Sequence, residues 1–361
     1  MAPVPDLSTM SIRENQTLTP DEGPGKTTIE NQTVADALYD DLSFETFMVL
    51  YTFLDCGFLH LTSIIGVVGN ILNIIILGSH GMDETTNILL MSLSVSDLLT
   101  SLFFFSESLC CVVSKFDYPT SAYVTTFVRV YIFPNQMWVG VSFCLSTAIA
   151  IERCVAVLFP FHVGRVFTPQ RVRVVVVFIY IYMLAICCPV FNYYDYSWTF
   201  DQRYNATLPE FVFSQYYLDR FDSLENYRGY FVNNLVSNIP LIIIIICSVF
   251  IIYKLNCGKS MPIAQGSSKT RNERKIAKML LTVCLVTFFT YLPSSVIDSY
   301  LSFIPENLNN SLQYINVWLY QLNASSNFII YVTVSKKFRL SYHELFCKCV
   351  RSKVTREIRN Q

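Results

Sequence analysis

The sequence predicts an all-α membrane protein, a bundle of seven transmembrane helices followed by a short amphipathic eighth helix. Three observations predict this fold class. The 361-residue chain is 52% hydrophobic and only 15% charged, which is outside the range of ordinary soluble proteins. Seven mostly apolar stretches each reach the roughly 20 residues that a helix needs to cross the hydrocarbon of a bilayer. Positive charges gather in alternate connections between these stretches.

The predicted elements follow one another without an internal repeat, so residues 47–335 are expected to form one domain. Before them, residues 1–46 are polar, carry nine acids and lack the apolar core of a signal peptide, which predicts a disordered tail. After the spans, residues 336–347 are expected to form an amphipathic helix on the membrane surface and residues 348–361 a cytoplasmic tail. The seven spans are expected at roughly 51–78, 86–112, 123–157, 172–193, 229–255, 275–303 and 312–334.

The charge distribution predicts a multi-pass protein of the plasma membrane with its amino terminus outside. In this orientation the connections after the third and fifth spans and the tail are cytoplasmic, and they hold 19 of the 26 Lys and Arg residues. Four Asn-X-Ser/Thr sequons then lie outside, at Asn15, Asn31, Asn205 and Asn309, and are expected to be glycosylated. A fifth sequon, at Asn323, lies within the seventh span and is expected to stay unmodified.

Charged residues occur at membrane depth in two places, the pair Glu152-Arg153 at the inner edge of the third span and Asp97 within the second. Such residues are costly in a bilayer and are candidates for functional sites. Asp97 needs partners or a bound cation, because an unpaired buried carboxylate would be neutralised instead. Two interpretations stay open: hydrogen bonding of Asp97 by Asn70 and Asn327, or a cation site.

Six short patterns stand in order, each in its own span: Gly69-Asn70, Leu93–Leu99 around Asp97, Glu152-Arg153-Cys154, Pro240, Tyr291-Leu292-Pro293 and Asn327-Phe328-Ile329-Ile330-Tyr331. With these patterns the chain resembles the rhodopsin-like (class A) G-protein-coupled receptors over roughly residues 50–350. The resemblance implies a receptor that binds an extracellular ligand and activates a heterotrimeric G protein as the sixth helix moves outward. Within this family, the sequence most resembles invertebrate peptide receptors and molluscan chemosensory receptors.

The resemblance also implies a switch at the inner face, in which Glu152 holds Arg153 at rest. Arg153 would also meet an acid at the base of the sixth span, where Glu273 has a suitable position. The alternative is a solvated Glu273, since exposed ion pairs contribute only about 0–1 kcal/mol. Pro240 and Pro293 each remove a helix hydrogen bond and permit a kink. The expected switch residues are Glu152, Arg153, Glu273, Asn327, Tyr331, Pro293, Tyr291 and Pro240.

By the same resemblance, Asp97 would line a pocket for an allosteric sodium ion, and no other cofactor is expected. The residues of this pocket would be Asp97, Ser142, Asn323, Asn327 and Asn70.

The chain departs from the family pattern at several positions. Tyr291 stands where tryptophan is usual, and Phe328 replaces the usual proline of the seventh span. No cysteine occurs between Pro189 and Arg228, so the family disulfide to the second outer loop cannot form, and Val128 lies near its first position. The sequence leaves open what orders this loop.

Two groups of cysteines are candidates for covalent modification. Cys56 lies by topology near Cys110 and Cys111, and a disulfide to either one, or none, is compatible with the sequence. Cys347 and Cys349 follow the amphipathic stretch and are expected to be palmitoylated, with free thiols as the alternative.

The expected ligand surface combines an acidic, aromatic second outer loop with a pocket between the spans. The loop is either a vestibule that attracts cationic ligands or a self-packed lid. Asn135 replaces the aspartate of amine-binding relatives, and the seventh span has no lysine for a retinal Schiff base, which disfavours those two ligand classes. The candidate pocket residues are Glu107, Asn135, Tyr291, Asp298 and Gln321.

We therefore expect a receptor with an extracellular ligand, most simply a peptide, and with a heterotrimeric G protein and membrane lipid, but not nucleic acid, as its other partners. A chemosensory receptor for environmental small molecules is the alternative. A transporter is disfavoured because the sequence shows no internal repeat. An enzyme is not expected, because the four histidines are scattered near the span ends.

Overall fold

The computed structural model describes residues 49, 51–132, 135–257, 268–300 and 306–345 of the chain. The predictions for residues 1–46, with Asn15 and Asn31, and for Cys347, Cys349 and residues 348–361 lie outside this part. So do the side chains, though not the backbone, of Asn135, Glu273, Asp298 and Asn309.

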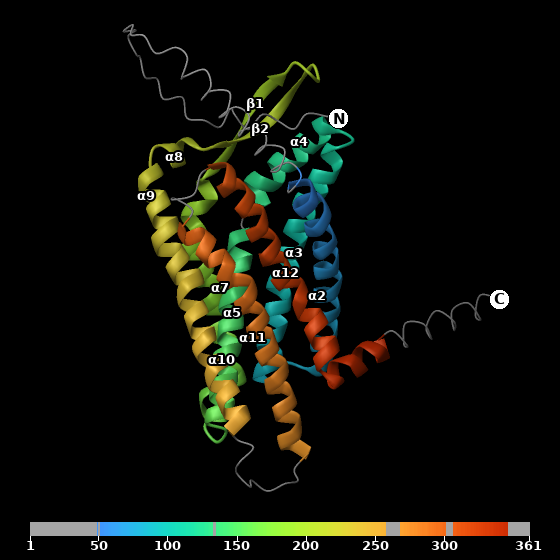
Figure 1. Ribbon diagram of the computed structural model, residues 1–361, viewed down its shortest axis with the longest axis vertical. Helices are drawn as coiled ribbons and strands as arrows, with labels where there is room; N and C mark the ends of the chain where they lie inside the picture. The colour runs from blue at the N-terminus through green and yellow to red at the C-terminus, as the bar shows by residue number, and fades with distance from the viewer. Residues whose placement is uncertain (1–48, 50, 133–134, 258–267, 301–305, 346–361) are drawn as a thin grey trace, which may run out of the picture.

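In the described part of the chain, seven long helical segments stand side by side in an elongated bundle (Figure 1). The first consists of η2 (Thr52–Leu59) and α2 (His60–His80), and the second of α3 (Thr85–Ser114). The third consists of α4 (Tyr118–Phe127), η3 (Val128–Ile132) and α5 (Asn135–Leu158). The fourth consists of α7 (Pro169–Cys187) and η4 (Cys188–Asn192). The fifth consists of α9 (Phe221–Asn226), η5 (Tyr227–Val232), η6 (Asn234–Asn238) and α10 (Ile239–Cys257). The sixth is α11 (Ser268–Tyr300) and the seventh α12 (Glu306–Val334). Short helices α6 (Val163–Val166) and α8 (Gln215–Leu218) lie in the connections.

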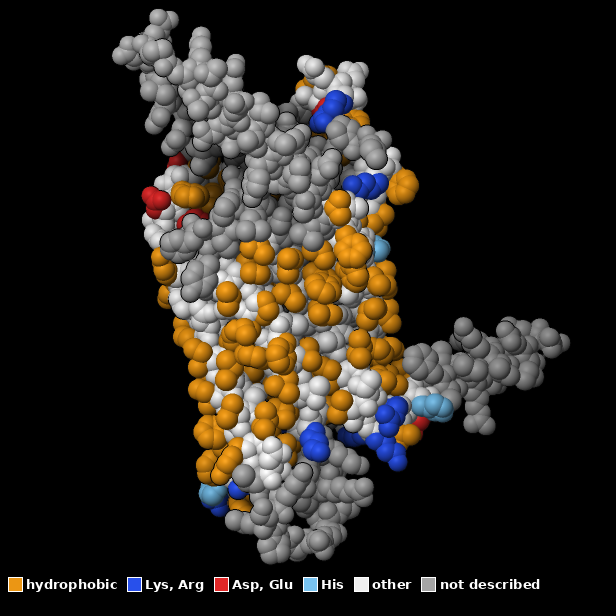
Figure 2. Space-filling model, in the orientation of Figure 1, with side chains coloured by type: hydrophobic (Ala, Val, Ile, Leu, Met, Phe, Trp, Pro, Cys, Tyr) orange, Lys and Arg blue, Asp and Glu red, His pale blue; other side chains and the backbone are white. Residues whose placement is uncertain are grey.

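Six of these segments, within the described residues, are long and apolar enough to cross a membrane. They are Thr52–His80, Thr85–Ser114, Gln136–Leu158, Pro169–Asn192, Phe221–Asn256 and Ile276–Ile297. Figure 2 shows hydrophobic side chains over the middle of one face of the bundle, with Lys, Arg, Asp and Glu toward its two ends. A bilayer selects this distribution, because charged side chains are costly in its hydrocarbon.

The seventh segment, α12, is not one of these six, and it packs between α2 and α11. Its polar side chains are turned into the bundle: Asn316, Gln321, Asn323 and Asn327 are all at most 3% exposed. Because the helix hides its amides among other helices, its low apolar content is compatible with the bundle position that we predicted. Asn323, whose sequon is expected to stay unmodified, is buried.

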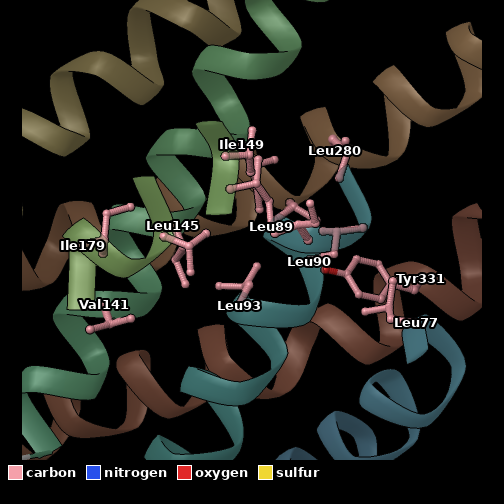
Figure 3. Packing of buried hydrophobic residues seen from close by; sticks show 14 of the residues in the cluster. Leu77, Leu89, Leu90, Leu93, Val141, Leu145, Ile149, Ile179, Leu280 and Tyr331 are labelled. Atoms are coloured by element: carbon pink, nitrogen blue, oxygen red, sulfur yellow. The ribbon is translucent and has the colours of Figure 1, made fainter. Parts of the chain in front are cut away.

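The bundle core joins most of the helices around one apolar cluster. Figure 3 shows Leu77 of α2, Leu93 of α3, Leu145 of α5 and Leu280 of α11 contributing to it together with Tyr331 of α12. Close approach of α2 and α12 depends on Gly69, since a Cβ there would lie 2.6 Å from the Cβ of Phe328. The phenylalanine that replaces the usual proline is thus accommodated by a glycine on the neighbouring helix.

Two segments carry the prolines that we expected to permit kinks. The π-helical turns η5 and η6 directly precede Pro240, which lies in the first turn of α10. π-Helical turns are local widenings of a helix, and they agree with a backbone that adapts to a proline without an N–H. Pro293 lies inside α11, which continues on both sides of it.

A β-hairpin that we did not predict covers the outer end of the bundle (Figure 1). Its strands, β1 (Tyr194–Asp201) and β2 (Ala206–Phe213), pair antiparallel, with Trp198 opposite Pro209. Asn205 occupies the turn with a positive φ of 46°, a conformation that asparagine tolerates better than most residues. Its side chain is exposed, so this predicted glycosylation site is accessible.

Candidate functional site

At the inner end of the bundle, Glu152 and Arg153 form a pair that is tied to α3. Nε and Nη2 of Arg153 both donate to the Glu152 carboxylate, and Nη2 also donates to Thr86 Oγ1. Thr85 Oγ1 donates to Glu152 Oε1 at 3.0 Å. The Glu152 side chain is 2% exposed and the Arg153 side chain 14%. The arginine is therefore held against its neighbour and α3.

The second predicted partner of Arg153 was Glu273. This residue lies in the first part of α11, where the structure describes the backbone but not the side chain. The pairing of Arg153 with Glu273 therefore remains a prediction.

In the middle of the bundle, the fully buried Asp97 connects three helices. Ser142 Oγ of α5 donates to Asp97 Oδ1 at 2.5 Å, and Asn327 Nδ2 of α12 donates to Asp97 Oδ2 at 2.7 Å. Ser94, one turn earlier on α3, has a buried hydroxyl without a hydrogen-bond partner in the described structure. Carboxylate and hydroxyl oxygens, such as those of Asp97 and Ser142, are of the kind that suits a hard cation.

The other two residues of the predicted sodium pocket make different contacts. Asn323 Nδ2 donates to Thr287 Oγ1 at 3.2 Å and to Thr290 Oγ1 at 3.1 Å, which links α12 to α11. Asn70 Nδ2 donates to the carbonyl of Ala324 at 3.0 Å. In this arrangement Asp97 is hydrogen-bonded by Asn327 but not by Asn70, so one half of the simple hydrogen-bonding interpretation is wrong.

Tyr291, two residues before Pro293 on its inner side, links α11 to α5. Its ring stacks on Phe143, with centroids 3.9 Å apart and planes 16° apart, and lies 5.3 Å from the ring of Tyr320. Its hydroxyl donates to the carbonyl of Val139 at 3.2 Å. At this position tyrosine adds a polar bond between α5 and α11 to the aromatic packing.

The outer ends of the first three segments carry a group of charges. Glu107 of α3 lies 3.5 Å from Arg129 of η3, whose guanidinium also lies 5.6 Å from the ring centre of Phe211 in β2. The buried Asp55 of η2 interacts electrostatically with both Glu107 and Arg129. Glu107, a predicted ligand contact, thus already forms an ion pair with Arg129. Our sequence analysis did not single out Arg129. Its positive charge within an apolar stretch was the signal that could have identified it.

The hairpin is anchored by side chains of the third segment, which answers what orders the second outer loop. Tyr123 Oη donates to the carbonyl of Thr207 at 3.1 Å, and Thr126 Oγ1 donates to the carbonyl of Pro209 at 3.2 Å. Val128, near the position of the missing family cysteine, is buried instead. Hydrogen bonds and ring contacts therefore hold this loop to the third segment, where the family pattern has a disulfide.

The loop packs largely on itself. Tyr194 stacks on Phe211 and Phe213, with ring centres 4.5 and 5.5 Å apart, and burial of the Tyr194 side chain raises the pKa of its hydroxyl. Trp198 and Phe200 on the same strand remain more than half exposed. The loop thus has a packed base, as the lid interpretation predicts, and an open aromatic tip.

A disulfide joins Cys56 of η2 to Cys111 of α3, with their Cα atoms 5.3 Å apart. Cys110 is a buried free thiol. The sequence left the choice between the two neighbours open, and the structure assigns the bond to Cys111. It fastens the first two segments at their outer ends.

Gln321, a predicted pocket residue, is fully buried between helices. Its Nε2 donates to the carbonyl of Thr62 at 3.1 Å and to Ser101 Oγ at 3.2 Å. A Cβ at Gly66 would lie 2.6 Å from this nitrogen. Our placement of Gln321 on a ligand surface is therefore not supported in this arrangement, because its amide joins α2, α3 and α12.

Comparison with known proteins gives one matching family model, described as 7 transmembrane receptor (rhodopsin family), over residues 69–331. The tachykinin-like peptides receptor 86C of Drosophila melanogaster is 26% identical over 299 residues, which cover 76% of this chain and 55% of that protein. Somatostatin receptor type 2 of Sus scrofa is 27% identical over 320 residues, 86% of this chain and 79% of that protein. The thyrotropin-releasing hormone receptor of Bos taurus is 23% identical over 344 residues, 85% of this chain and 79% of that protein. The chain thus spans about half the length of the first of these relatives and about four fifths of the other two.

Proposed function

Because this chain belongs to the rhodopsin family of seven-transmembrane receptors, we propose that it binds an extracellular peptide and activates a heterotrimeric G protein. A ligand can shift such a bundle only if it binds the active arrangement more tightly than the resting one. The transducing element is the cytoplasmic end of α11, which moves outward when Arg153 is released.

The observation that carries the signalling proposal is the Glu152–Arg153 pair. Two buried charges at the membrane edge are costly, and here they are paired with each other and with two threonines of α3. In such an arrangement the guanidinium of Arg153 can exchange one partner for another while it remains within the bundle. A buried ion pair used only for stability would be replaced at little cost by apolar residues at both positions.

The peptide ligand is supported by the outer surface and by the relatives. Three relatives of similar identity carry the names of peptide receptors or hormone receptors. The hairpin exposes Trp198 and Phe200, and acids outnumber bases in the loop between the fourth and fifth segments. Rings and carboxylates together suit a ligand that carries basic side chains. Neither the described structure nor these relatives supports the chemosensory or the transporter alternative.

We also propose that Asp97 and Ser142 hold a sodium ion, which would neutralise the carboxylate. Ser94, one turn before Asp97 on α3, would supply a further hydroxyl oxygen. We further propose that the amino terminus lies outside the plasma membrane and that the four outer sequons carry glycans. Cys347 and Cys349 would carry palmitoyl groups.

The test is a screen of amidated basic peptides on cells that report G-protein activation. We expect a peptide that activates through the wild-type chain, and we expect Arg153→Ala to abolish this response while surface delivery and peptide binding persist. Surface staining of an amino-terminal tag is the control for delivery. A peptide response that survives Arg153→Ala would contradict the proposed switch.

A further inference from the structure

The helix formed by residues 336–345 is fastened to α2 by side-chain hydrogen bonds as well as by apolar packing. Tyr342 Oη donates to Asn73 Oδ1, and a second bond of 2.9 Å joins His80 Nε2 and Ser341 Oγ. Asn73 is fully buried and Tyr342 is 5% exposed. In Figure 1 this helix turns away from the foot of α12 beside the lower end of α2.

From Asn73 the polar contacts continue toward the middle of the bundle. Asn73 Nδ2 donates to Asn70 Oδ1 at 3.5 Å, and Asn70 Nδ2 donates to the carbonyl of Ala324 at 3.0 Å. Ala324 lies three residues before Asn327, the α12 residue that donates to Asp97. One line of buried polar groups therefore runs from the cytoplasmic helix to the Asp97 centre.

An apolar residue of similar size would fill the volume of Asn73 and would need no hydrogen-bond partner. The amide of Asn73 is therefore not required for packing. Burying its amide is favourable only while its partners are present, since an unsatisfied buried polar group costs more than a hydrogen bond contributes. Such groups act mainly by selecting one arrangement among several well-packed ones. Here the selected arrangement is the docked position of the 336–345 helix.

The docked helix also constrains Tyr331. Its Phe338 ring lies 5.0 Å from the Tyr331 ring and 5.5 Å from the His80 ring. Tyr331 is fully buried, and its hydroxyl has no hydrogen-bond partner among the described residues. Figure 3 shows this hydroxyl pointing toward the side chain of Leu90. A buried hydroxyl in apolar surroundings is disfavoured, so Tyr331 remains there because its neighbours hold it.

We propose that Asn73 and Tyr342 are positioning residues of the switch: their hydrogen bond docks the 336–345 helix, which in turn holds Tyr331 and the Asp97 centre in the resting arrangement. This inference rests on the proposed receptor function. It implies that a partner or lipid that pulls on the cytoplasmic helix shifts the bundle through α2, a helix to which we assigned no part in the switch.

The test compares Tyr342→Phe, Asn73→Leu and the double variant. Tyr342→Phe removes only the hydroxyl and keeps the ring, which packs 5.3 Å from Phe328. Tyr180→Phe is the matched control, because it removes a tyrosine hydroxyl that donates at 3.2 Å to the carbonyl of Ser92, elsewhere between two helices. Two readouts are used: ligand-free G-protein activation per surface receptor, and amide hydrogen exchange of receptor in nanodiscs without G protein.

We expect each single variant to raise ligand-free activation about fivefold, the effect of losing one neutral hydrogen bond from the resting state. The double variant should match Asn73→Leu, because that variant already removes the partner of the Tyr342 hydroxyl along with its own bond to Asn70. Amide exchange should become faster in residues 336–345 and also in residues 276–281 of α11. The control Tyr180→Phe should leave α11 unchanged.

Faster exchange confined to residues 336–345 would show that the bond only docks the helix, and it would overturn the inference. Additive effects in the double variant would overturn it as well, because the two residues would then act independently. Hydrogen exchange needs no G protein. A wild-type chain that activates none would therefore count against the proposed function, while the exchange data would still decide whether Asn73 positions α11.

Discussion

Neutralising Glu152 tests the resting state most directly. The variant Glu152→Gln keeps the size of the side chain and removes the charge that accepts from two nitrogens of Arg153 and from Thr85. An amide offers one acceptor oxygen where the carboxylate offers two, and its nitrogen cannot accept from a guanidinium. Arg153 then loses most of what holds it, and the active arrangement becomes more populated.

The size of the shift follows from the contacts. Hydrogen bonds to charged groups contribute about 1.5–3 kcal/mol, and the low exposure of both side chains argues against a smaller effect. Since about 1.4 kcal/mol is a factor of ten, the equilibrium between resting and active arrangements shifts roughly 10- to 150-fold. A receptor that is about 1% active without ligand would become roughly 10–60% active.

The assay is ligand-free nucleotide exchange on purified heterotrimeric G protein, measured per receptor in nanodiscs. The control is Glu84→Gln, which neutralises an exposed acid next to Thr85. The Glu84 side chain makes no capping hydrogen bond to α3, so its neutralisation leaves the helix start unchanged. A Glu152→Gln baseline equal to those of the wild type and the control, at the same receptor amount, would refute the view that this pair maintains the resting state.

Three further outcomes are expected. Asp97→Asn should weaken the effect of sodium chloride on agonist affinity in binding assays, and an unaltered sodium response would count against the cation site. Glu273→Ala should raise ligand-free signalling if this acid meets Arg153, whereas a flat baseline would leave Glu273 as a solvated charge. Cys111→Ser should lower the thermal stability of the purified protein, because it opens a bridge between residues 55 apart, for which chain entropy gives about 4 kcal/mol. Cys110→Ser should not, and equal losses in both would contradict the assigned bond.

The sequence predicted those parts of the site that depend on local pattern and on membrane energetics. Charges such as Asp97 and Arg153 stand out in apolar stretches because hydrocarbon tolerates them only with partners. The resemblance to the receptor family placed Ser142 and Asn327 near Asp97, and the structure brings these three residues together.

The polar seventh span shows where pattern reasoning reaches its limit. Sequence placed a helix at residues 312–334, but nothing in the pattern distinguished an amide that faces a ligand from one that joins helices. Gln321 joins α2 and α3, because the rotation of α12 within the bundle decides what each of its side chains meets.

By itself, then, the sequence determined the bundle, its order of helices and the charged residues that a membrane makes conspicuous. Tertiary structure alone decided the choice of Cys111 over Cys110, the hairpin held by Tyr123 and Thr126, and the bond between Asn73 and Tyr342, which are 269 residues apart. The physical reason is that burial of apolar surface acts on each segment separately. A hydrogen bond or disulfide needs two groups within a few ångströms, which only the packed helices bring about.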